Sequence, residues 1–355
     1  MTSAWSEDNN HASIKFHGNK NRVAEENHFV HAVLGNYPRL CRLRDGSLLL
    51  GYSAPRRGHR ALTVVRSTDD GRSFKSHGVV GRAVGDYDNM FLLELPSDGK
   101  EPPIVLAAFR NHDLDSRGSH TYFRITVCQS SDGGRNWEFL SHVYEKTAPF
   151  GLWEPFMRLT EQGELQLYFS QELAPEDQDT MKVISLDQGR TWTPPTCVTG
   201  MGERLRDGMV GIAETKDNGR AALVMVFETT RYGTFSIECV ISYDDGATFG
   251  CRQPVFTPSK GSNAGSPQIA AFADGSLAVT FMTDGDSGLQ GWPANAAVKA
   301  VFTLPPRKGQ LQWSQAYHVH VAASFWPGLL RIGDDTALAV FEYAGGIRGR
   351  LLISG

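Results

Sequence analysis

The sequence predicts an all-β protein folded as a six-bladed β-propeller, a closed ring of small antiparallel sheets. An octapeptide of pattern SxDxGxx(W/F) occurs four times, starting at Ser67, Ser130, Ser185 and Ser242, so that successive starts are 63, 55 and 57 residues apart. A second series of turn-forming pairs consists of Asp45-Gly46, Asp98-Gly99, Gln162-Gly163, Asn218-Gly219, Asp274-Gly275 and Asp334-Asp335. Together the two series divide the 355 residues into six units of about 59 residues, the size of a four-stranded blade with long loops.

Each kind of turn has a fixed place in the predicted blade. The pairs of the second series lie between two apolar runs, so we expect them to join strands 1 and 2. The octapeptides follow apolar, alternating segments such as 121–128 and 235–241, and we expect them to join strands 3 and 4. In such a turn the Asp accepts hydrogen bonds from backbone amides, the Gly takes the left-handed conformation and the aromatic ring tucks beneath.

The last unit is predicted to borrow a strand from the start of the chain. After Phe325 it contains three strands, over 328–332, 336–343 and 348–353. We expect segment 27–33 to supply the fourth strand, because closing the ring leaves no unpaired sheet edge.

The composition agrees with a single globular domain over residues 1–355 and limits its partners. Hydrophobic residues make up 41% and charged residues 21% of the chain, and no Pro/Ser/Gly linker or charge block marks a boundary. A formal net charge of -4 provides no broad basic surface for a nucleic acid or an anionic membrane. We therefore expect a monomer whose partner is neutral or small.

The sequence contains no motif for a metal or a cofactor, and we expect neither. The five cysteines form no CxxC pair and are interpreted as mostly buried thiols. His318 and His320 share a predicted strand, but there is no HExxH motif, no cluster of His and carboxylates, and no glycine-rich phosphate loop.

Antiparallel order places the candidate pocket at one end of the propeller. The 1/2 and 3/4 turns share one face, so the starts of strand 1 and the ends of strand 2 meet on the opposite face. Strand-1 starts contribute Tyr37, Asp88, Asn89, Glu154, Asp207, Ser266, Gln268 and Trp326, and strand-2 ends contribute Arg110, Asn111, His112, Asp113, Gln171, Glu172, Glu228, Asp284 and Tyr343. Carboxylates and aromatic rings dominate this set, which favours a neutral sugar as ligand.

Two glutamates of this set fit a glycoside hydrolase that retains configuration, which needs a nucleophilic carboxylate and a protonated carboxyl group. Glu154 lies between Trp153 and Pro155-Phe156, an apolar setting that favours the protonated form, and is predicted to be the acid/base. Glu228 ends an apolar run in the next unit and is predicted to be the nucleophile. Asp207, in the same unit, is the alternative nucleophile or a residue that orients sugar hydroxyls.

Several segments resemble glycoside hydrolase family 93, the exo-1,5-α-L-arabinanases. They are 124–128, Gly151-Leu-Trp-Glu-Pro-Phe156, Arg206-Asp-Gly-Met209, 226–229, Asn263-Ala-Gly-Ser-Pro-Gln268, 281–284 and 326–330. The octapeptides resemble the Asp-box of the sialidase-like propellers, which is structural and not catalytic. The resemblance covers essentially the whole chain. It implies an enzyme that releases arabinobiose from a chain end of linear α-1,5-L-arabinan with retention, using Glu154 and Glu228.

A sialidase fits these residues less well. A sialic acid carboxylate calls for a cluster of arginines, and Arg110 is the only arginine among the strand ends facing the predicted pocket. Where sialidases open with Arg-Ile-Pro, this chain has Asn36-Tyr37-Pro38, and Trp326 stands in the place of their nucleophilic Tyr. Two other classes stay open: another glycoside hydrolase or a polysaccharide lyase on this fold, and a non-catalytic carbohydrate-binding propeller.

Substrate-binding residues are predicted around the two glutamates, with aromatic faces for sugar rings and polar groups for hydroxyls. They are Tyr37, Asp88, Asn89, Arg110, Asn111, His112, Trp153, Arg206, Asn263, Gln268 and Trp326. Residues 110–113 are expected to form a polar loop, and a long 110–120 loop would block one end of the pocket for exo action. Because arabinan lies outside the cell, we expect secretion with a signal peptide absent from this chain, and a cytoplasmic location is the alternative.

Overall fold

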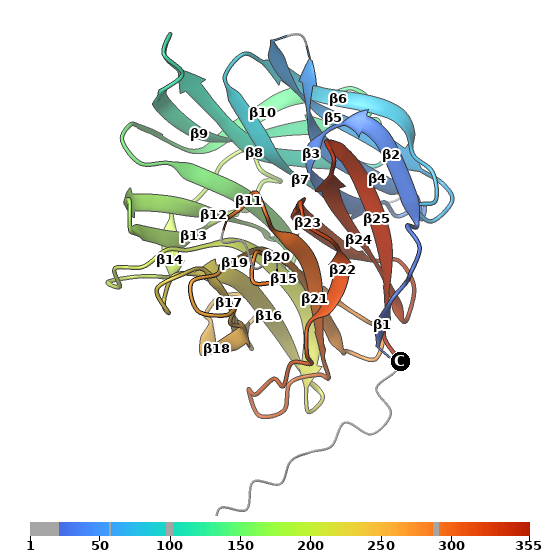
Figure 1. Cartoon of the computed structure of the whole chain (residues 1–355). Helices are drawn as coiled ribbons and strands as arrows, with labels where there is room; N and C mark the ends of the chain where they lie inside the picture. The colour runs from blue at the N-terminus through green and yellow to red at the C-terminus, as the bar shows by residue number, and fades with distance from the viewer. Residues whose placement is uncertain (1–20, 57, 97–101, 287–290) are drawn as a thin grey trace, which may run out of the picture.

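The protein is described by a computed structural model covering residues 21–56, 58–96, 102–286 and 291–355. These residues form six antiparallel sheets, seen in Figure 1 as blades around a common axis. Blade 1 contains β3 (Asn36–Arg42), β4 (Leu48–Arg56), β5 (His59–Ser67) and β6 (Lys75–Ala83), and blade 2 contains β7 (Asp86–Glu94), β8 (Val105–Leu114), β9 (His120–Ser130) and β10 (Glu138–Thr147). Blade 3 contains β11 (Leu152–Leu159), β12 (Leu165–Ala174), β13 (Asp177–Ser185) and β14 (Thr196–Thr199).

The other three blades complete the ring. Blade 4 contains β15 (Asp207–Asp217), β16 (Arg220–Thr229), β17 (Ser236–Ser242) and β18 (Gly250–Phe256), and blade 5 contains β19 (Ala264–Ala271), β20 (Leu277–Thr283), β21 (Ala297–Thr303) and β22 (Tyr317–His320). Blade 6 contains β23 (Ser324–Arg331), β24 (Thr336–Tyr343) and β25 (Gly346–Ile353), and the N-terminal strands β1 (Arg22–Val23) and β2 (Phe29–Leu34) pair with β25. The first strands contact one another in a cycle, β3 to β7, β11, β15, β19, β23 and back to β3.

The predicted six-bladed propeller and its closing strand are thus confirmed. Strand β23 begins at Ser324, earlier than the predicted start at residue 328, because Ser324 and Phe325 still pair with Tyr343 and Glu342 before the register shifts. The Asp98-Gly99 turn lies outside the described residues.

The four octapeptides join strands 3 and 4 of blades 1 to 4, as predicted, and share one hydrogen-bond pattern. In the first, the Ser67 hydroxyl accepts a hydrogen bond from the Gly71 amide at 2.9 Å and donates one to Asp69 at 2.6 Å. The Asp69 carboxylate also accepts from the Ser73 amide at 2.9 Å. Gly71 has φ 79°, the left-handed conformation that glycine adopts without steric cost. These turns therefore stabilise the face of the ring opposite the predicted pocket.

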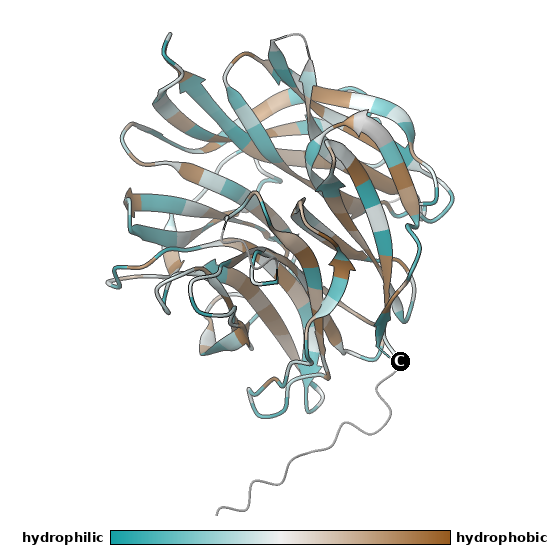
Figure 2. Cartoon of the chain, in the orientation of Figure 1, coloured by the Kyte–Doolittle hydropathy of each residue, from teal (hydrophilic) through white to brown (hydrophobic). Residues whose placement is uncertain are grey.

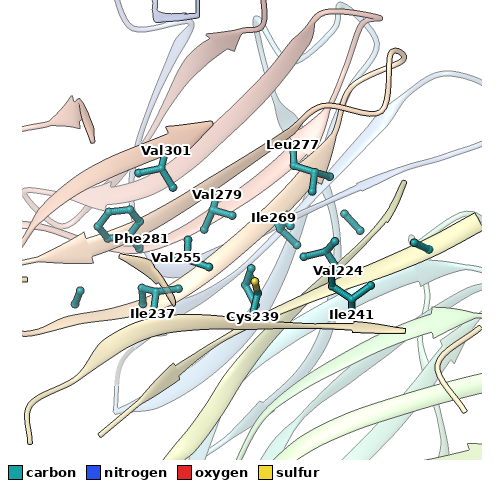
Figure 3. Packing of buried hydrophobic residues seen from close by; sticks show 14 residues of the cluster. Val224, Ile237, Cys239, Ile241, Val255, Ile269, Leu277, Val279, Phe281 and Val301 are labelled. Carbon is teal, nitrogen blue, oxygen red and sulfur yellow. The ribbon is translucent and has the colours of Figure 1, made fainter. Parts of the chain in front are cut away.

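Apolar side chains fill the space between neighbouring blades. Between blades 4 and 5 the buried cluster in Figure 3 includes Val224, Ile237, Ile241, Ile269, Val279 and Phe281. In Figure 2 the apolar residues of the strands appear as brown stretches. All five cysteines are free thiols; Cys41, Cys128 and Cys239 are buried, whereas Cys251 is exposed.

The first strand of every blade carries a β-bulge at the same place. The pairing between strands 1 and 2 shifts register there in all six blades. One residue in each bulge has a left-handed backbone: Tyr37 (φ 53°), Asn89 (φ 55°), Glu154 (φ 43°), Met209 (φ 54°), Ser266 (φ 54°) and Trp326 (φ 52°). Side chains other than glycine adopt this conformation at a cost of about 1–3 kcal/mol, and such strain gathers at functional sites. The bulges thus mark one ring of positions around the axis.

Candidate active site

The ring of six bulges defines the candidate site. With the blades in order around the axis, Glu154 faces Trp326, Asn89 faces Ser266, and Tyr37 faces Met209 across the ring. Four of the six residues precede a proline, as in Glu154-Pro155 and Ser266-Pro267. Five of the six were among the strand-1 positions predicted from the sequence; Met209 was not.

Glu154 has the more strongly raised pKa of the two central carboxyl groups. Burial of this carboxyl group and the charge of Glu228 raise its pKa to about 8, against the opposing charge of Arg110. Ser170, on the adjacent strand β12, hydrogen-bonds the Glu154 carboxyl group. The acid is therefore protonated at neutral pH, when it can donate a proton.

Glu228 is buried at the end of β16 and is held by the backbone of the next blade. Its Oε2 accepts a hydrogen bond from the Ser266 amide at 2.8 Å. Burial raises the pKa of Glu228 to about 7, while the Ser266 amide and the charge of Arg206 favour the ionised form. A Cβ atom on Gly265 would lie 2.5 Å from Oε2, so a larger residue there would require the Glu228 carboxylate to move.

Arg206 forms a bridge beside the two glutamates. Its Nη2 donates to Glu172 Oε1 at 2.7 Å and to Gln178 Oε1 at 2.8 Å. The other oxygen of Glu172 accepts from the Gly151 amide at 2.7 Å. Arg206 is thus fixed close enough to influence Glu228, whereas Glu172 raises the pKa of Glu154. Arg206 and Glu172 therefore increase the difference in pKa between Glu154 and Glu228.

Asp207 is engaged elsewhere. Its side chain has no exposed surface, and both carboxylate oxygens accept hydrogen bonds from the Arg252 guanidinium, at 2.7 and 3.0 Å. Arg252 also contacts Glu238 and Thr229. A carboxylate fixed in a buried bidentate pair is a poor nucleophile, so the geometry favours Glu228 over Asp207.

Tyr37 lies within the electrostatic range of both Glu154 and Asp88. Tyr37 is buried under the guanidinium of Arg39, 3.9 Å from its ring centroid. Burial raises the pKa of Tyr37, and the charges of Glu154 and Asp88 add to this effect while Arg39 opposes it. Asp88 accepts hydrogen bonds from Ser53 and Arg60.

Residues 110–113 are not a loop, contrary to the expectation. They continue strand β8, with Arg110 opposite Ile125 and Asp113 opposite Tyr122 on β9, because β9 supplies pairing partners along its whole length. The connection to β9 is therefore short, residues 115–119, and the expected long 110–120 loop is absent. Asp86 and Asp88 lie within β7.

Several predicted binding residues serve the protein itself. His112 is buried; its Nε2 donates to the Leu152 carbonyl at 2.8 Å, and burial lowers its pKa to about 4, so it stays neutral. Asn111 Nδ2 donates to Thr126 Oγ1 at 3.3 Å, Asn263 Oδ1 accepts from the Phe235 amide at 3.1 Å, and Gln268 Nε2 donates to the Val210 carbonyl at 3.3 Å. These contacts leave fewer groups for a ligand than the sequence predicted.

The aromatic side chains around the site differ in their environments. Trp153 packs against His112, His120 and Phe123, with Arg110 5.2 Å from its ring centroid, so it is part of a packed cluster. Trp326 and Tyr37 lie side by side with ring centroids 6.3 Å apart. Trp292 lies against the position of Gly265, next to Glu228.

Sequence reasoning missed Ser170 and Gly265, and it did not select Glu172 or Ser266 from among the pocket positions as partners of the two glutamates. The residue-proline pattern shared by Tyr37, Glu154, Ser266 and Trp326 was the available signal for Ser266. Ser170 carries no motif, because its role depends on the neighbouring strand. In the described ranges no group of three or more His, Cys, Asp or Glu side chains suits a metal ion, and no helix is long and apolar enough to cross a membrane.

Several solved structures have a fold similar to that of this chain. An α-L-arabinofuranosidase of Fusarium graminearum, solved with an iminosugar inhibitor, is 19% identical, with 95% of this chain and 97% of that chain covered and a TM-score of 0.64. An α-L-arabinanase of Penicillium chrysogenum in complex with arabinobiose is 19% identical, covers 90% and 92%, and has a TM-score of 0.63. The NanB sialidase of Streptococcus pneumoniae is 12% identical, covers 90% and 68%, and has a TM-score of 0.55.

The likeness to these enzymes shows a shared fold. A further solved structure of the Fusarium graminearum enzyme, with arabinobiose, is described as a member of glycoside hydrolase family 93, and it is 20% identical over 90% of this chain with a TM-score of 0.64. No protein-family model matches the sequence, and no curated protein matches it either.

Proposed function

We propose that this protein is a retaining, exo-acting glycoside hydrolase that cleaves linear α-1,5-L-arabinan and releases arabinobiose. One observation carries the proposal: two buried carboxyl groups, Glu154 and Glu228, lie on neighbouring blades, near enough for the charge of Glu228 to raise the pKa of Glu154. Because the Ser266 amide and the charge of Arg206 favour the ionised form of Glu228, the pair is suited to hold one protonated acid and one carboxylate, the state that a retaining glycosidase requires. The enzymes of similar fold that bind arabinobiose support arabinan as the substrate.

In the first step the Glu228 carboxylate attacks the anomeric carbon of the sugar. A carbon–oxygen bond to Glu228 forms as the glycosidic carbon–oxygen bond breaks, and the proton of Glu154 passes to the leaving oxygen. The Ser266 amide holds the Glu228 carboxylate in place during this step. The products are a glycosyl ester on Glu228 and the shortened chain.

In the second step the Glu154 carboxylate takes a proton from water. The water oxygen attacks the anomeric carbon, and the bond to Glu228 breaks, which restores both side chains. Two displacements on opposite sides of the carbon give net retention.

Exo action is supported by the depth of the nucleophile. Glu228 and Tyr37 are only 9% and 5% exposed, inside the ring of bulges. A chain end reaches such a position more readily than the middle of a polymer. An arabinan substrate also implies that the protein acts outside the cell.

The test is product analysis of linear arabinan treated with the wild type, Glu154→Gln, Glu228→Gln and the exposed-site control Glu161→Gln, with a sialoside as a second substrate. Arabinobiose from the wild type and the control, and none from the two active-site variants, is the expected result. Binding of arabinan without turnover by the wild type would instead indicate a non-catalytic propeller. Sialic acid release would overturn the substrate assignment.

A further inference from the structure

A groove crosses the pocket face of blades 6, 1 and 2. It consists of two adjoining hollows of about 260 and 640 Å³ that share Leu34, Pro55 and Arg60. The smaller hollow reaches Glu342 on β24, and the larger one reaches His120 on β9. The larger volume lies within the range of about 300–1,000 Å³ typical of ligand sites.

The charged side chains of the groove are mostly paired with one another. Arg110 lies 2.9 Å from Asp86 and 3.6 Å from Asp88, and His120 lies 2.9 Å from Asp86. Arg60 pairs with Asp88. Donors and acceptors are therefore plentiful while little net charge remains, which suits a neutral, hydroxyl-rich ligand.

Glu342 is the exception to this pairing. In the part of the chain that the structure describes, no hydrogen-bond or ion-pair partner of its carboxyl group is found, although the side chain is half-buried at the groove. An ionised carboxyl group in that setting is stabilised when hydroxyl groups donate to it.

The rim of the groove is apolar and exposed. Leu34 is 60%, Val84 74% and Leu114 37% exposed. Such side chains contact the C–H faces of sugar rings, as in other carbohydrate sites built from apolar walls and a few polar groups.

The groove reaches the neighbourhood of Glu154. Arg110, which lines the larger hollow, lies 5.2 Å from the ring centroid of Trp153, the residue before Glu154. Asn36, which lines the smaller hollow, precedes Tyr37, whose pKa is raised in part by the charge of Glu154. Glu228 lies away from it, against Ser266 of blade 5. Because the acid protonates the leaving oxygen, the leaving group lies on its side of the bond.

We propose that this groove binds the sugar units on the leaving-group side of the cleaved bond, and that Glu342 accepts hydrogen bonds from the hydroxyls of the first of these units. This inference rests on the proposed glycosidase function. It assigns Glu342 a role in substrate specificity outside the catalytic pair.

The experiment compares two substrates with the same transferred unit, arabinobiose: an α-1,5-arabino-oligosaccharide, with a sugar leaving group, and a nitrophenyl α-1,5-arabinobioside, with a small aromatic one. Glu342→Gln keeps the size of the side chain and removes its charge. We expect kcat/KM to fall about tenfold more for the oligosaccharide than for the nitrophenyl substrate, mainly through KM, because one hydrogen bond to a charged group is lost. Glu342→Asp should recover part of the loss, and Glu161→Gln should behave as the wild type.

Each outcome is decisive. Equal losses on the two substrates would overturn the assignment of Glu342 to the leaving-group side, and unchanged kinetics on both would overturn any role in binding. Absence of turnover by the wild type on either substrate would overturn the proposed function, and this inference with it. Equal melting temperatures of wild type and Glu342→Gln serve as the folding control.

Discussion

Replacing Glu154 by Gln is expected to stabilise the protein at alkaline pH and to leave its stability unchanged in acid. The pKa of Glu154 is raised from the ordinary 4.5 to about 8, so the folded state holds this proton more tightly than the unfolded state. The stabilisation that comes from keeping Glu154 protonated in the folded state is fully present below pH 4.5 and is lost as the pH rises through about 8. Glutamine never ionises and avoids that loss.

The size of the effect follows from the shift. Each pKa unit corresponds to about 1.36 kcal/mol, so ionising Glu154 costs at most about 5 kcal/mol. Part of that cost is repulsion from Glu228, which the variant relieves as well. At pH 9 we expect a gain of about 2–5 kcal/mol, or a melting temperature higher by about 4–10 °C in a chain of this size. At pH 4 the gain should vanish.

The assay is thermal unfolding of wild type, Glu154→Gln and Glu161→Gln at pH 4, 7 and 9. Glu161 is exposed, so its variant controls for the loss of one carboxylate without burial. An equal difference between Glu154→Gln and wild type at pH 4 and pH 9, or destabilisation at pH 9, would refute the burial of an ionisable acid at this position.

Three further outcomes are expected. The kcat/KM of the wild type should be bell-shaped in pH, rising near pH 7 as Glu228 ionises and falling near pH 8 as Glu154 loses its proton; an optimum below pH 5 would contradict these roles. Gly265→Ala should lower kcat/KM at least about tenfold by displacing the Glu228 carboxylate, whereas Gly250→Ala, with open space around it, should have no effect. Asp207→Asn should cost about 3–5 kcal/mol in urea unfolding by breaking the buried pair with Arg252, and full stability with abolished turnover would identify Asp207 as the nucleophile instead.

The propeller could be predicted because its signals are local. An octapeptide such as 67–74 makes all its defining hydrogen bonds within eight residues, so the sequence alone specifies the turn. The closing strand was found because the last unit lacked one strand and a closed ring demands it. The bulges were not found, because a register shift depends on pairing between strands, and only the prolines after Glu154 and Ser266 hint at it.

The candidate site could be predicted in part. Glu154 and Glu228 stood out through their apolar neighbours in the sequence. The groups that hydrogen-bond the two carboxyl groups, Ser170 and the Ser266 amide, come from adjacent strands or blades and carry no local pattern. Residues 110–113 were expected to be a loop because they are polar. They lie on β8 instead, where backbone pairing with β9 extends the strand despite their polar side chains.

Carboxyl groups on the two faces of the propeller change the folding stability in opposite directions as the pH changes. On the turn face, hydrogen bonds from Ser67 and Ser73 hold the pKa of Asp69 near 2, so its stabilising contribution is present above pH 3.8 and is lost as the pH falls through about 2. On the pocket face, the raised pKa values of Glu228 and Glu154 make stability fall as the pH rises through about 7 and about 8. The combined contribution of these three groups to stability is therefore greatest near pH 4–4.5, above the unfolded pKa of Asp69 and not above that of the two glutamates. In the proposed mechanism turnover requires ionised Glu228, so we expect the activity to be greatest at a pH above that of the greatest stability, because burial disfavours the charge that would attack the sugar.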